Sequence, residues 1–514
     1  MYHSASLTIS VYIAALLVWR LVRFTLLPKL HPQEPREVPY WTPFLGHAVS
    51  YIRNPTKVLT DCRNYFHDDR KPFSITLAGK RLYIITAPQD VTTTCRNSST
   101  LSMDIFTQDV MRGFDVSPWA LVRVFQKPGE DFQLINSNPR HKSLAHLTME
   151  HFRRQLFPGE KLAELGRITL DYINGAVRWE CLSSPKFLLA DAGEYREISL
   201  LHWCEDVLLQ AATQSFFGSA LIGLSPNLLD NFLAFDAVSW KLMYRLPRIL
   251  SQDMEEQKYN LIKAIETYLD LPKEQRPGAN WFTEMQEFEM RGLDISTRDI
   301  AKLISAIYWV INTNAYKLLF WMLAFLLQDE DLTATVTAEL RAVFRSDGKL
   351  DIPSLQTHTP YLTALWYEAL RLTNSSASAR VVTSDTQLGP YVLRAGNRLL
   401  IPYHQLHRNV STFGEDADKF DISRFLDDEK LPQNPSFRPF GGGVTYFPGR
   451  FLAKQEIFMA IAFLLCRFDV ELKMDGNVKQ KFPRMDEAKP GIGIVGPVKG
   501  DDLVIKLKPK GMVQ

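Results

Sequence analysis

The sequence has few cysteines, and no two of them are spaced to hold zinc. Its five cysteines are spread over 514 residues, their number is odd, and no two are separated by only two residues. Neither a disulfide framework nor a zinc site is therefore predicted. The pattern is typical of a protein whose body lies in a reducing compartment.

An excess of charge of one sign is also lacking. The chain has 59 basic and 57 acidic residues, which gives a formal net charge of +2. A nucleic-acid-binding surface normally requires a basic excess, so we expect no nucleic-acid partner. With 46% hydrophobic and 23% charged residues and no low-complexity run, the composition is that of a globular protein with enough apolar material for a large core.

Lysine, arginine, aspartate and glutamate are absent from the first 19 positions, which include the apolar run Val11–Val18. Counted through Leu27, this segment reaches the roughly 20 residues that a membrane-spanning helix needs. A cleaved signal peptide is the alternative, but a basic stretch before the run and a small-residue cleavage site are both missing. We therefore expect residues 1–29 to be an uncleaved membrane anchor.

The residues after the apolar run indicate how the anchor is oriented. Arg20, Arg23 and Lys29 all follow it, and basic residues stay on the cytosolic side of a membrane, so we expect a lumenal N-terminus and a cytosolic body at the endoplasmic reticulum. Residues 30–48 are rich in proline. Because proline blocks helix and favours an extended path, this segment is interpreted as a stiff hinge.

The apolar periodicity indicates helices from about residue 50 to 340, including a long apolar helix over Ile300–Leu327. Short β-type segments appear later, at Arg380–Thr383 and Leu399–Pro402. The C-terminal residues Gly491–Leu507 have the pattern of a β-hairpin or ladder. The sequence therefore predicts a mainly α fold with small β-sheets.

Glycines gather in the segment 440–453, which reads F-G-G-G-V-T-Y-F-P-G-R-F-L-A. It resembles the haem-binding loop of cytochromes P-450, F-x-x-G-x-x-x-C-x-G-x-x-x-A. Phe440, Gly443, Gly449 and Ala453 match this pattern, and Phe447 stands at the position of the cysteine. Glycines suit a loop that folds tightly under a flat macrocycle and then enters a helix.

A second motif lies upstream of this loop. Glu368 and Arg371 form an E-x-x-R pair, whose spacing puts both charges on one helix face, and Arg424 is similar to the family's later arginine, which would complete an ion network. The resemblance is closest to the prostacyclin synthase and sterol 7α-hydroxylase branch, as in fungal pathway enzymes. It implies a cytochrome P-450 fold for residues 49–514, at a membrane, with a lipophilic small-molecule substrate.

Phe447 changes what the resemblance implies about the cofactor. In the family the cysteine thiolate is the protein's bond to the haem iron and favours O–O cleavage. A phenyl ring has no lone pair to donate, and it should project toward the space of the iron. Cys466 comes nineteen residues later, in the helix that follows. We therefore predict no cofactor, and haem only if the chain is an ordinary member of the family.

Other departures fall on positions that serve haem and oxygen in the family. The segment Val310–Asn314 stands where monooxygenases carry A-G-x-(E/D)-T, so the acid and the glycine are missing. The segment Asn136–His146 lacks the tryptophan of the family's propionate-binding helix, and Thr445 replaces an arginine or histidine. Arg380 is the one propionate-type arginine that remains in place.

A haem slot left vacant would be costly. A void of several hundred Å3 would destabilise the fold by on the order of 10 kcal/mol. Three outcomes stay open: side chains such as Phe447 and Ile311 have grown into the slot, haem binds without a thiolate, or the slot has joined a substrate pocket. We expect partial repacking with an enlarged apolar cavity.

The leading hypothesis is a catalyst without redox chemistry. We expect a cyclase or isomerase, for example an intramolecular Diels–Alderase, acting on a lipophilic terpenoid or polyketide intermediate of secondary metabolism, with no reductase partner. Asn312, Thr313 and Asn314 are the candidate hydrogen-bond donors, and Lys317, one turn beyond Thr313, is a candidate electrostatic group.

Three other interpretations stay open. The chain could be a haem-dependent monooxygenase that tolerates the change at Phe447, or a degenerate pseudoenzyme. It could also be a non-catalytic partner that tethers other pathway enzymes at the membrane, in which case a filled core and a large exposed apolar patch are expected.

Overall fold

Helices dominate the structure, as the sequence predicts. The computed structural model describes residues 2–127, 142–443, 446–476, 478–489, 491 and 493–511. The helices that build the body around the site are α6 (Asp104–Gly113), α8 (Leu144–Leu156), α9 (Glu160–Ala176), α10 (Leu200–Phe217), α12 (Leu228–Val238), α14 (Gln252–Asp270), α15 (Trp281–Gly292), α16 (Thr297–Asn312), α17 (Ala315–Gln328), α18 (Glu330–Ala342), α20 (Pro360–Thr373) and α24 (Arg450–Arg467).

The described strands form two larger sheets and two short hairpins. A six-stranded sheet has the order β1-β2-β3-β10-β7-β4, and a four-stranded sheet has the order β11-β14-β6-β5. Their bounds are β1 (Arg36–Glu37), β2 (Phe73–Leu77), β3 (Lys80–Ile84), β4 (Leu101–Ser102), β5 (Leu188–Asp191), β6 (Arg196–Ser199), β7 (Ala377–Val382), β10 (Arg398–Pro402), β11 (Phe468–Leu472) and β14 (Val504–Pro509). The mainly α fold with small sheets is therefore confirmed.

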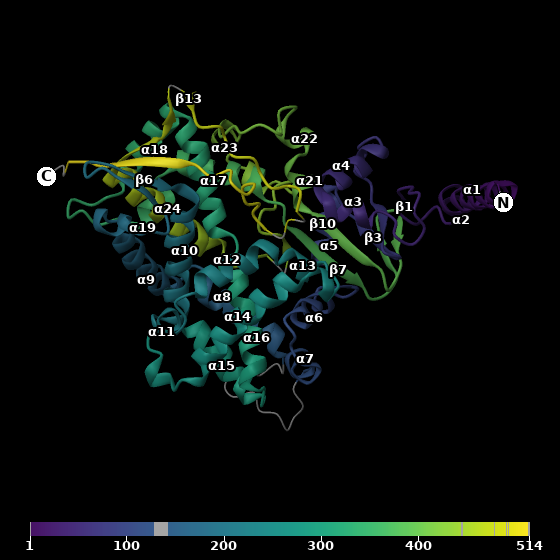
Figure 1. Cartoon of the computed structure of the whole chain (residues 1–514), viewed down its shortest axis with the longest axis horizontal. Coiled ribbons are helices and arrows are strands. Elements are labelled where there is room, and N and C mark those ends of the chain that lie inside the picture. Colours follow the sequence, from purple (N-terminus) through teal and green to yellow (C-terminus); the bar gives the residue numbers. More distant parts are fainter. Residues whose placement is uncertain are drawn as a thin grey trace.

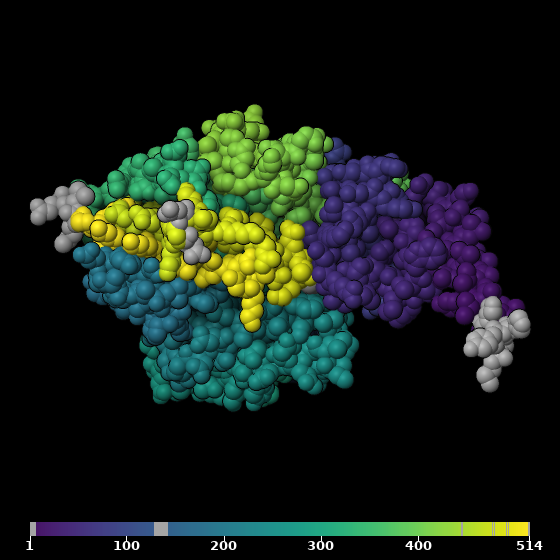
Figure 2. Space-filling model, turned by 45° about the horizontal axis from the view of Figure 1, so that its top comes forward, coloured from purple at the N-terminus to yellow at the C-terminus, as the bar shows by residue number. Residues whose placement is uncertain are grey.

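The two β-type segments predicted in the C-terminal half pair with each other. β7 and β10 are antiparallel, with Arg380 opposite Leu399. Of the hairpin and the ladder predicted near the C-terminus, the structure has the ladder, because β14 pairs with β11 on one side and with β6 on the other. Figure 2 shows these last residues as a yellow band across the surface, beside segments from much earlier in the chain. Alternating side chains identify a strand, but they do not identify its partner.

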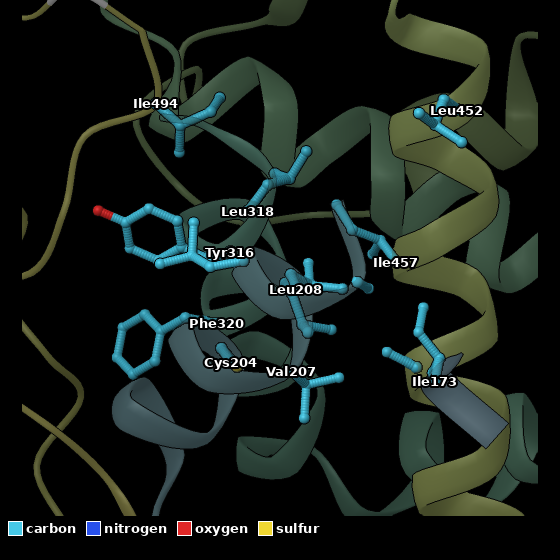
Figure 3. Packing of buried hydrophobic residues seen from close by; sticks show 14 of the residues in the cluster. Ile173, Cys204, Val207, Leu208, Tyr316, Leu318, Phe320, Leu452, Ile457 and Ile494 are labelled. Carbon is cyan, nitrogen blue, oxygen red and sulfur yellow. The ribbon is translucent and has the colours of Figure 1, made fainter. Parts of the chain in front are cut away.

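The long apolar helix expected over Ile300–Leu327 is divided in two. α16 ends at Asn312 and α17 begins at Ala315, so Thr313 and Asn314 lie in a break. α17 is apolar on nearly all sides and almost wholly buried. Both properties are typical of a helix at the centre of a large core. Figure 3 shows Leu318 and Phe320 of α17 among side chains of α10 and α24, the latter including Ile457.

The N-terminal helix stands apart from this core. α1 (Tyr2–Leu21) continues through a π-helical turn into α2 (Leu27–Leu30), and the apolar segment Leu7–Leu30 has no buried part. Figure 1 shows it projecting at the end of the molecule opposite the C-terminus. By length and composition it is a candidate membrane anchor. The segment Thr297–Gln328 passes the same test but is mostly buried, as a core helix is.

The proline-rich segment interpreted as a hinge is joined to the body. It is not helical, as predicted, but β1 within it pairs in parallel with β2. Glu37 is buried there, accepts a hydrogen bond from Thr76 and forms an ion pair with Arg23 of 2.8 Å. The segment is therefore the edge of the six-stranded sheet and not a free spacer, because its polar groups find partners on that sheet.

Candidate functional site

The glycine-rich loop before α24 has a backbone that only glycine fits at one position. Gly443 has a φ of +64°, and a Cβ there would lie 2.3 Å from the carbonyl oxygen of Cys95. The loop then closes on itself, because the Phe447 N–H donates to the Phe440 carbonyl at 3.0 Å. Thr445 lies outside the described residues. The glycine pattern therefore reflects close contact between the loop and α5 (Pro88–Arg96).

Phe447 lies between the start of α24 and a large cavity. Its ring packs against Gly449, where a Cβ would lie 2.5 Å from Cε1 of the ring. Its carbonyl accepts a hydrogen bond from Arg450 of 2.8 Å, and its side chain forms part of the cavity wall. The ring is therefore held between Gly449 and the cavity.

This cavity has a volume of about 610 Å3. Its lining includes Leu303, Ala306, Ile307 and Val310 of α16, residues of α6 and α8, and Phe447. Most of the lining is apolar, and the volume is in the range of pockets that bury a small-molecule ligand. An apolar cavity thus lies beside Phe447, where the sequence led us to expect one.

Charged side chains lie on two helices of the cavity wall. On α8 and just before it, Lys142 pairs with Glu150, and the Ser143 hydroxyl contacts Nδ1 of His146 at 2.7 Å. Nε2 of His146 is 4.0 Å from Asp104 at the start of α6. Most of this set is exposed or half-buried. Each acid of this wall therefore has a basic neighbour: Glu150 has Lys142, and Asp104 has the imidazole of His146.

The ion network predicted from the E-x-x-R motif is present. Arg371 donates two hydrogen bonds of 2.7 Å to Glu368, and both side chains are fully buried. Arg424 joins at 3.7 Å from the same carboxylate. Arg371 also donates to the carbonyl of His407 at 2.9 Å. Bidentate geometry and further acceptors are what a buried ion pair needs to offset its desolvation.

His407 connects this network to the loop. Burial lowers the pKa of His407 well below its ordinary value, so the ring stays neutral and can accept at one nitrogen. Its Nε2 accepts the Arg438 N–H at 3.0 Å. The network therefore holds the chain just before Phe440.

The four residues predicted as catalytic lie elsewhere. Asn312 donates to the carbonyl of Tyr308 at 2.9 Å, and Oδ1 of Asn314 accepts from the N–H of Ile494 at 2.8 Å. Thr313 and Lys317 both bind Asp236, the latter at 2.6 Å. None of the four is among the described residues that line the large cavity. Their face of the helix turns toward α12 and the C-terminal segment.

Asp236 is the residue that the sequence reasoning missed. Its side chain is 1% exposed, and besides Thr313 and Lys317 it accepts hydrogen bonds from Trp309 at 3.1 Å and from Tyr316 at 2.9 Å. It thus fastens α12 to both sides of the break between α16 and α17. The available signal was an acid within the apolar run Phe-Leu-Ala-Phe-Asp-Ala-Val of α12, since a buried carboxylate requires partners.

A smaller cavity of about 210 Å3 lies beside this cluster, lined in part by Asp236, Lys317 and Glu205. Burial raises the pKa of Glu205 to about 8, helped by the charge of Asp502 and opposed by Lys317. Thr313 and Lys317 are therefore neighbours on one helix face, as predicted, but they face a second, smaller space.

Residues 217–495 match the family described as "Cytochrome P450", which is more than half of the 514 residues. The chain belongs to the cytochrome P-450 family. The expected fold is therefore confirmed, including the small sheets beside the helical body.

Similar proteins extend the match to nearly the whole length of this P-450 chain. "Cytochrome P450 monooxygenase poxD" of Penicillium oxalicum is 26% identical, covering 90% of this chain and 92% of the relative. "Cytochrome P450 monooxygenase calL" of Penicillium decumbens is 24% identical, over 96% and 98%. The human "7-alpha-hydroxycholest-4-en-3-one 12-alpha-hydroxylase" is 25% identical, over 92% and 93%. The relatives are thus fungal P-450 proteins and sterol hydroxylases, the branch that the motifs suggested.

The residues of this P-450 chain do not fit a haem held by a thiolate. Phe447, at the family's cysteine position, has no electron pair to offer an iron. Cys466 lies in the last turn of α24, and burial raises the pKa of its thiol to about 11. Cys95 contacts the loop from α5 and is also buried, with its pKa raised by burial. Both thiols are held in the neutral form, which is a poor iron ligand.

Proposed function

We propose that this cytochrome P-450 chain is a non-oxidative cyclase or isomerase, such as an intramolecular Diels–Alderase, acting on a lipophilic terpenoid or polyketide intermediate of fungal-type secondary metabolism. The observation that carries the proposal is Phe447, a residue unable to bind iron, on the wall of an apolar cavity of about 610 Å3. No reductase is required for such a reaction, since no electron enters it.

The cavity wall supports this chemistry by shape. Ile307 and Val310 of α16 face the same space as Phe447, and these side chains hydrogen-bond neither to water nor to substrate. A flexible polyene held between such walls is confined to few conformers, so its two reacting ends can meet. Confinement of this kind can contribute several kcal/mol to a ring closure, because rotational entropy is lost on binding and not at the barrier.

The charged groups at α6 and α8 supply the polar part of the site. Lys142 and His146 line the cavity, where a cationic or N–H group can donate a hydrogen bond to a carbonyl on the substrate. A donor aimed at a carbonyl that gains negative charge lowers the barrier. Asn312, Thr313, Asn314 and Lys317 are not needed for this step.

The relatives favour a second candidate, a haem-dependent monooxygenase. Two of the fungal proteins are named monooxygenases, and the human relative is named a hydroxylase. In this alternative, haem would bind without a cysteine thiolate. The non-catalytic partner has less support, because the filled core expected of it is not what the described residues form around Phe447.

A spectrum separates the two catalytic proposals. The full-length protein, expressed with haem supplied and purified in detergent, is examined by absorbance and by the reduced carbon monoxide difference spectrum. The cyclase proposal expects no Soret band, and turnover of pathway intermediates without NADPH. A Soret band at the thiolate position, with NADPH-dependent turnover, would contradict it. The proposal also places the anchor in the endoplasmic reticulum membrane and the body in the cytosol, which microscopy of the tagged protein in intact cells and protease protection of microsomes would test.

A further inference from the structure

Phenyl and indole rings form part of the lining of the large cavity. They belong to segments far apart in the sequence, namely α7 (Pro118–Phe125), α8, α16 and the glycine-rich loop. The rings are those of Phe125, Phe152, Trp309 and Phe447, and the buried Arg380 of β7 lines the same space. A ligand in this cavity is therefore offered ring surfaces by several parts of the fold.

Neighbouring rings hold two of these side chains in place. Phe152 packs on Phe282 of α15, with ring centroids 4.1 Å apart. Trp309 packs on Phe114, with centroids 6.0 Å apart, and its indole Nε1 donates to Asp236 at 3.1 Å. Side chains fixed in this way lose little further freedom when a ligand binds, so their contacts add to its affinity.

Methionines are also frequent on the cavity wall. Four of the thirteen methionines of the chain line it, from α6 and the residue before it, from α8 and from α15: Met103, Met111, Met149 and Met290. A thioether is polarizable, contacts π systems favourably and adapts to irregular shapes. Rings and thioethers together form a lining that attracts a ligand by dispersion, and this attraction grows with the polarizability of the ligand.

A conjugated polyene suits such a lining better than a chain with isolated double bonds. Its electrons are delocalised and polarizable, and its planar shape lets an aromatic ring stack against it. It is also stiff, so it loses less conformational freedom on binding than a chain whose double bonds are separated by CH2 groups. Both effects favour the conjugated ligand, but only the first depends on the rings of the cavity.

We propose that the large cavity selects a substrate with a conjugated polyene, which lies against the rings of Trp309 and Phe152. This inference rests on the proposed function and narrows its substrate class, because a conjugated diene is what an intramolecular Diels–Alder reaction consumes. In that ring closure two carbon–carbon single bonds form at the expense of two π bonds. No proton, electron or leaving group is exchanged, so no co-reactant is needed.

The test compares two isomeric esters. Methyl α-eleostearate has three conjugated double bonds, and methyl α-linolenate has the same formula with CH2 groups between its double bonds. Both are offered together to full-length protein in nanodiscs and to empty nanodiscs, which are then separated by a tag on the protein, and each ester is measured by chromatography. Wild type should enrich the conjugated ester about fivefold or more over its isomer, relative to empty nanodiscs, the effect expected of one good aromatic contact.

Substitutions assign the preference to the rings. Trp309→Leu and Phe152→Leu should each lower the enrichment ratio by about half or more, and Trp309→Phe should keep most of it because a ring remains. The matched control is Trp119→Leu, at a position that is 47% exposed on α7, and it should leave the ratio unchanged. Circular dichroism of each variant checks its fold, and the two Leu variants test the inference independently.

Equal enrichment of the two esters by wild type, or a ratio that survives both Leu variants, would overturn the inference. An absorbance spectrum of each preparation keeps the two proposals apart. A haem band means that the proposed function fails, whereas a haem-free protein without preference for the conjugated ester means that only this inference fails.

Discussion

The Phe447 ring occupies space beside Gly449 and the cavity wall, and the loop around it keeps the glycines that fit under a macrocycle. The ExxR network that holds this loop is complete. The loop and the ion network that holds it are therefore retained, whereas the position of the iron-binding sulfur is taken by a phenyl ring. At the residue scale, we therefore expect that restoring a cysteine at position 447 restores haem binding.

Phe447→Cys should restore haem binding. The change removes the ring and places a thiol on the wall of the cavity, so a Soret band and a reduced carbon monoxide band are expected when haem is supplied. Phe451→Cys, at the second position of α24, is the control and should give no band. A haem-free Phe447→Cys protein that is folded would mean that the slot has repacked beyond this one side chain.

The raised pKa of Glu205 predicts a dependence of stability on pH. The folded-state pKa of about 8 exceeds the ordinary value of 4.5, so the folded protein holds this proton more tightly. The stability from this proton is complete below about pH 4.5 and is lost as the pH rises through about 8. Unfolding in urea across this range should show a smaller decline for Glu205→Gln than for wild type; an equal decline would assign the effect to other groups.

At the scale of the elements, the break between α16 and α17 is held by one carboxylate. Asp236 reaches Trp309 before the break and Tyr316 and Lys317 after it. These donors and Thr313 are spaced i, i+4, i+7 and i+8, so they lie along one face, and Asp236 binds all of them across the break. The break therefore depends on α12, which contacts it through Asp236.

Asp236→Asn should destabilise the fold by about 3 kcal/mol, because it leaves the nearly buried Lys317 without its counter-charge. Chemical unfolding monitored by circular dichroism measures the change. Asp230→Asn on the same helix is the control: its pair with Lys186 is exposed on both sides, so it should change stability by less than about 1 kcal/mol. Similar losses in the two variants would show that Asp236 is not the fastening point.

Ion pairs also hold α6 over the large cavity. Asp109 on the outer face of α6 binds Arg112 at 2.8 Å, Arg245 in the loop before α14, and Arg398 of β10 at 2.5 Å. The inner face of the same helix lines the cavity, with Val110 and Met111. Movement of α6 would therefore break these pairs before it opened the cavity.

Asp109→Asn should speed ligand entry several-fold, since the two arginines from other elements then lose their common anion. Stopped-flow fluorescence of an apolar probe entering the full-length protein measures the rate. Raised salt should speed entry into wild type and change the variant less, because screening weakens the same pairs. Asp61→Asn, at an exposed pair with Lys57, is the control. No change in the Asp109→Asn entry rate would place the entrance elsewhere.

At the scale of the whole molecule, the N-terminal helix meets the body at its base. Arg20 donates to the carbonyl of Tyr40 and lies over the Trp41 ring at 3.8 Å, and Trp19 contacts the Tyr40 ring. These contacts fix the direction in which the apolar helix leaves the sheet. The cavity and the ion network lie in the body, away from this contact.

Deletion of residues 1–30 should release the protein from membranes without unfolding it. Glu37 would lose Arg23 but keep Arg81 at 3.7 Å, so the sheet edge should persist. Flotation of cell membranes, with circular dichroism of the released protein, measures both effects. A deletion variant that stays with the membrane fraction would reveal a second attachment on the body.

The sequence by itself determined the family, the glycine-rich loop, the ion network and the presence of Phe447 at the family's cysteine position. These features are encoded by residue type at short spacing, such as Glu368 with Arg371 or Phe440 with Gly443 and Phe447, so no knowledge of distant contacts was needed. The candidate anchor could be predicted for the same reason, because a run of uncharged residues is a local property.

The tertiary structure decided which side chains meet. A periodic apolar helix does not reveal that it breaks at Thr313, nor which face turns to the cavity; the partner Asp236 on α12 settled both, and so turned Thr313 and Lys317 away from Phe447. β14 likewise found strands far away in the chain. The physical reason is common to these cases. Which elements contact each other depends on packing and on the pairing of buried polar groups between elements, and the local periodicity of the sequence does not predict either.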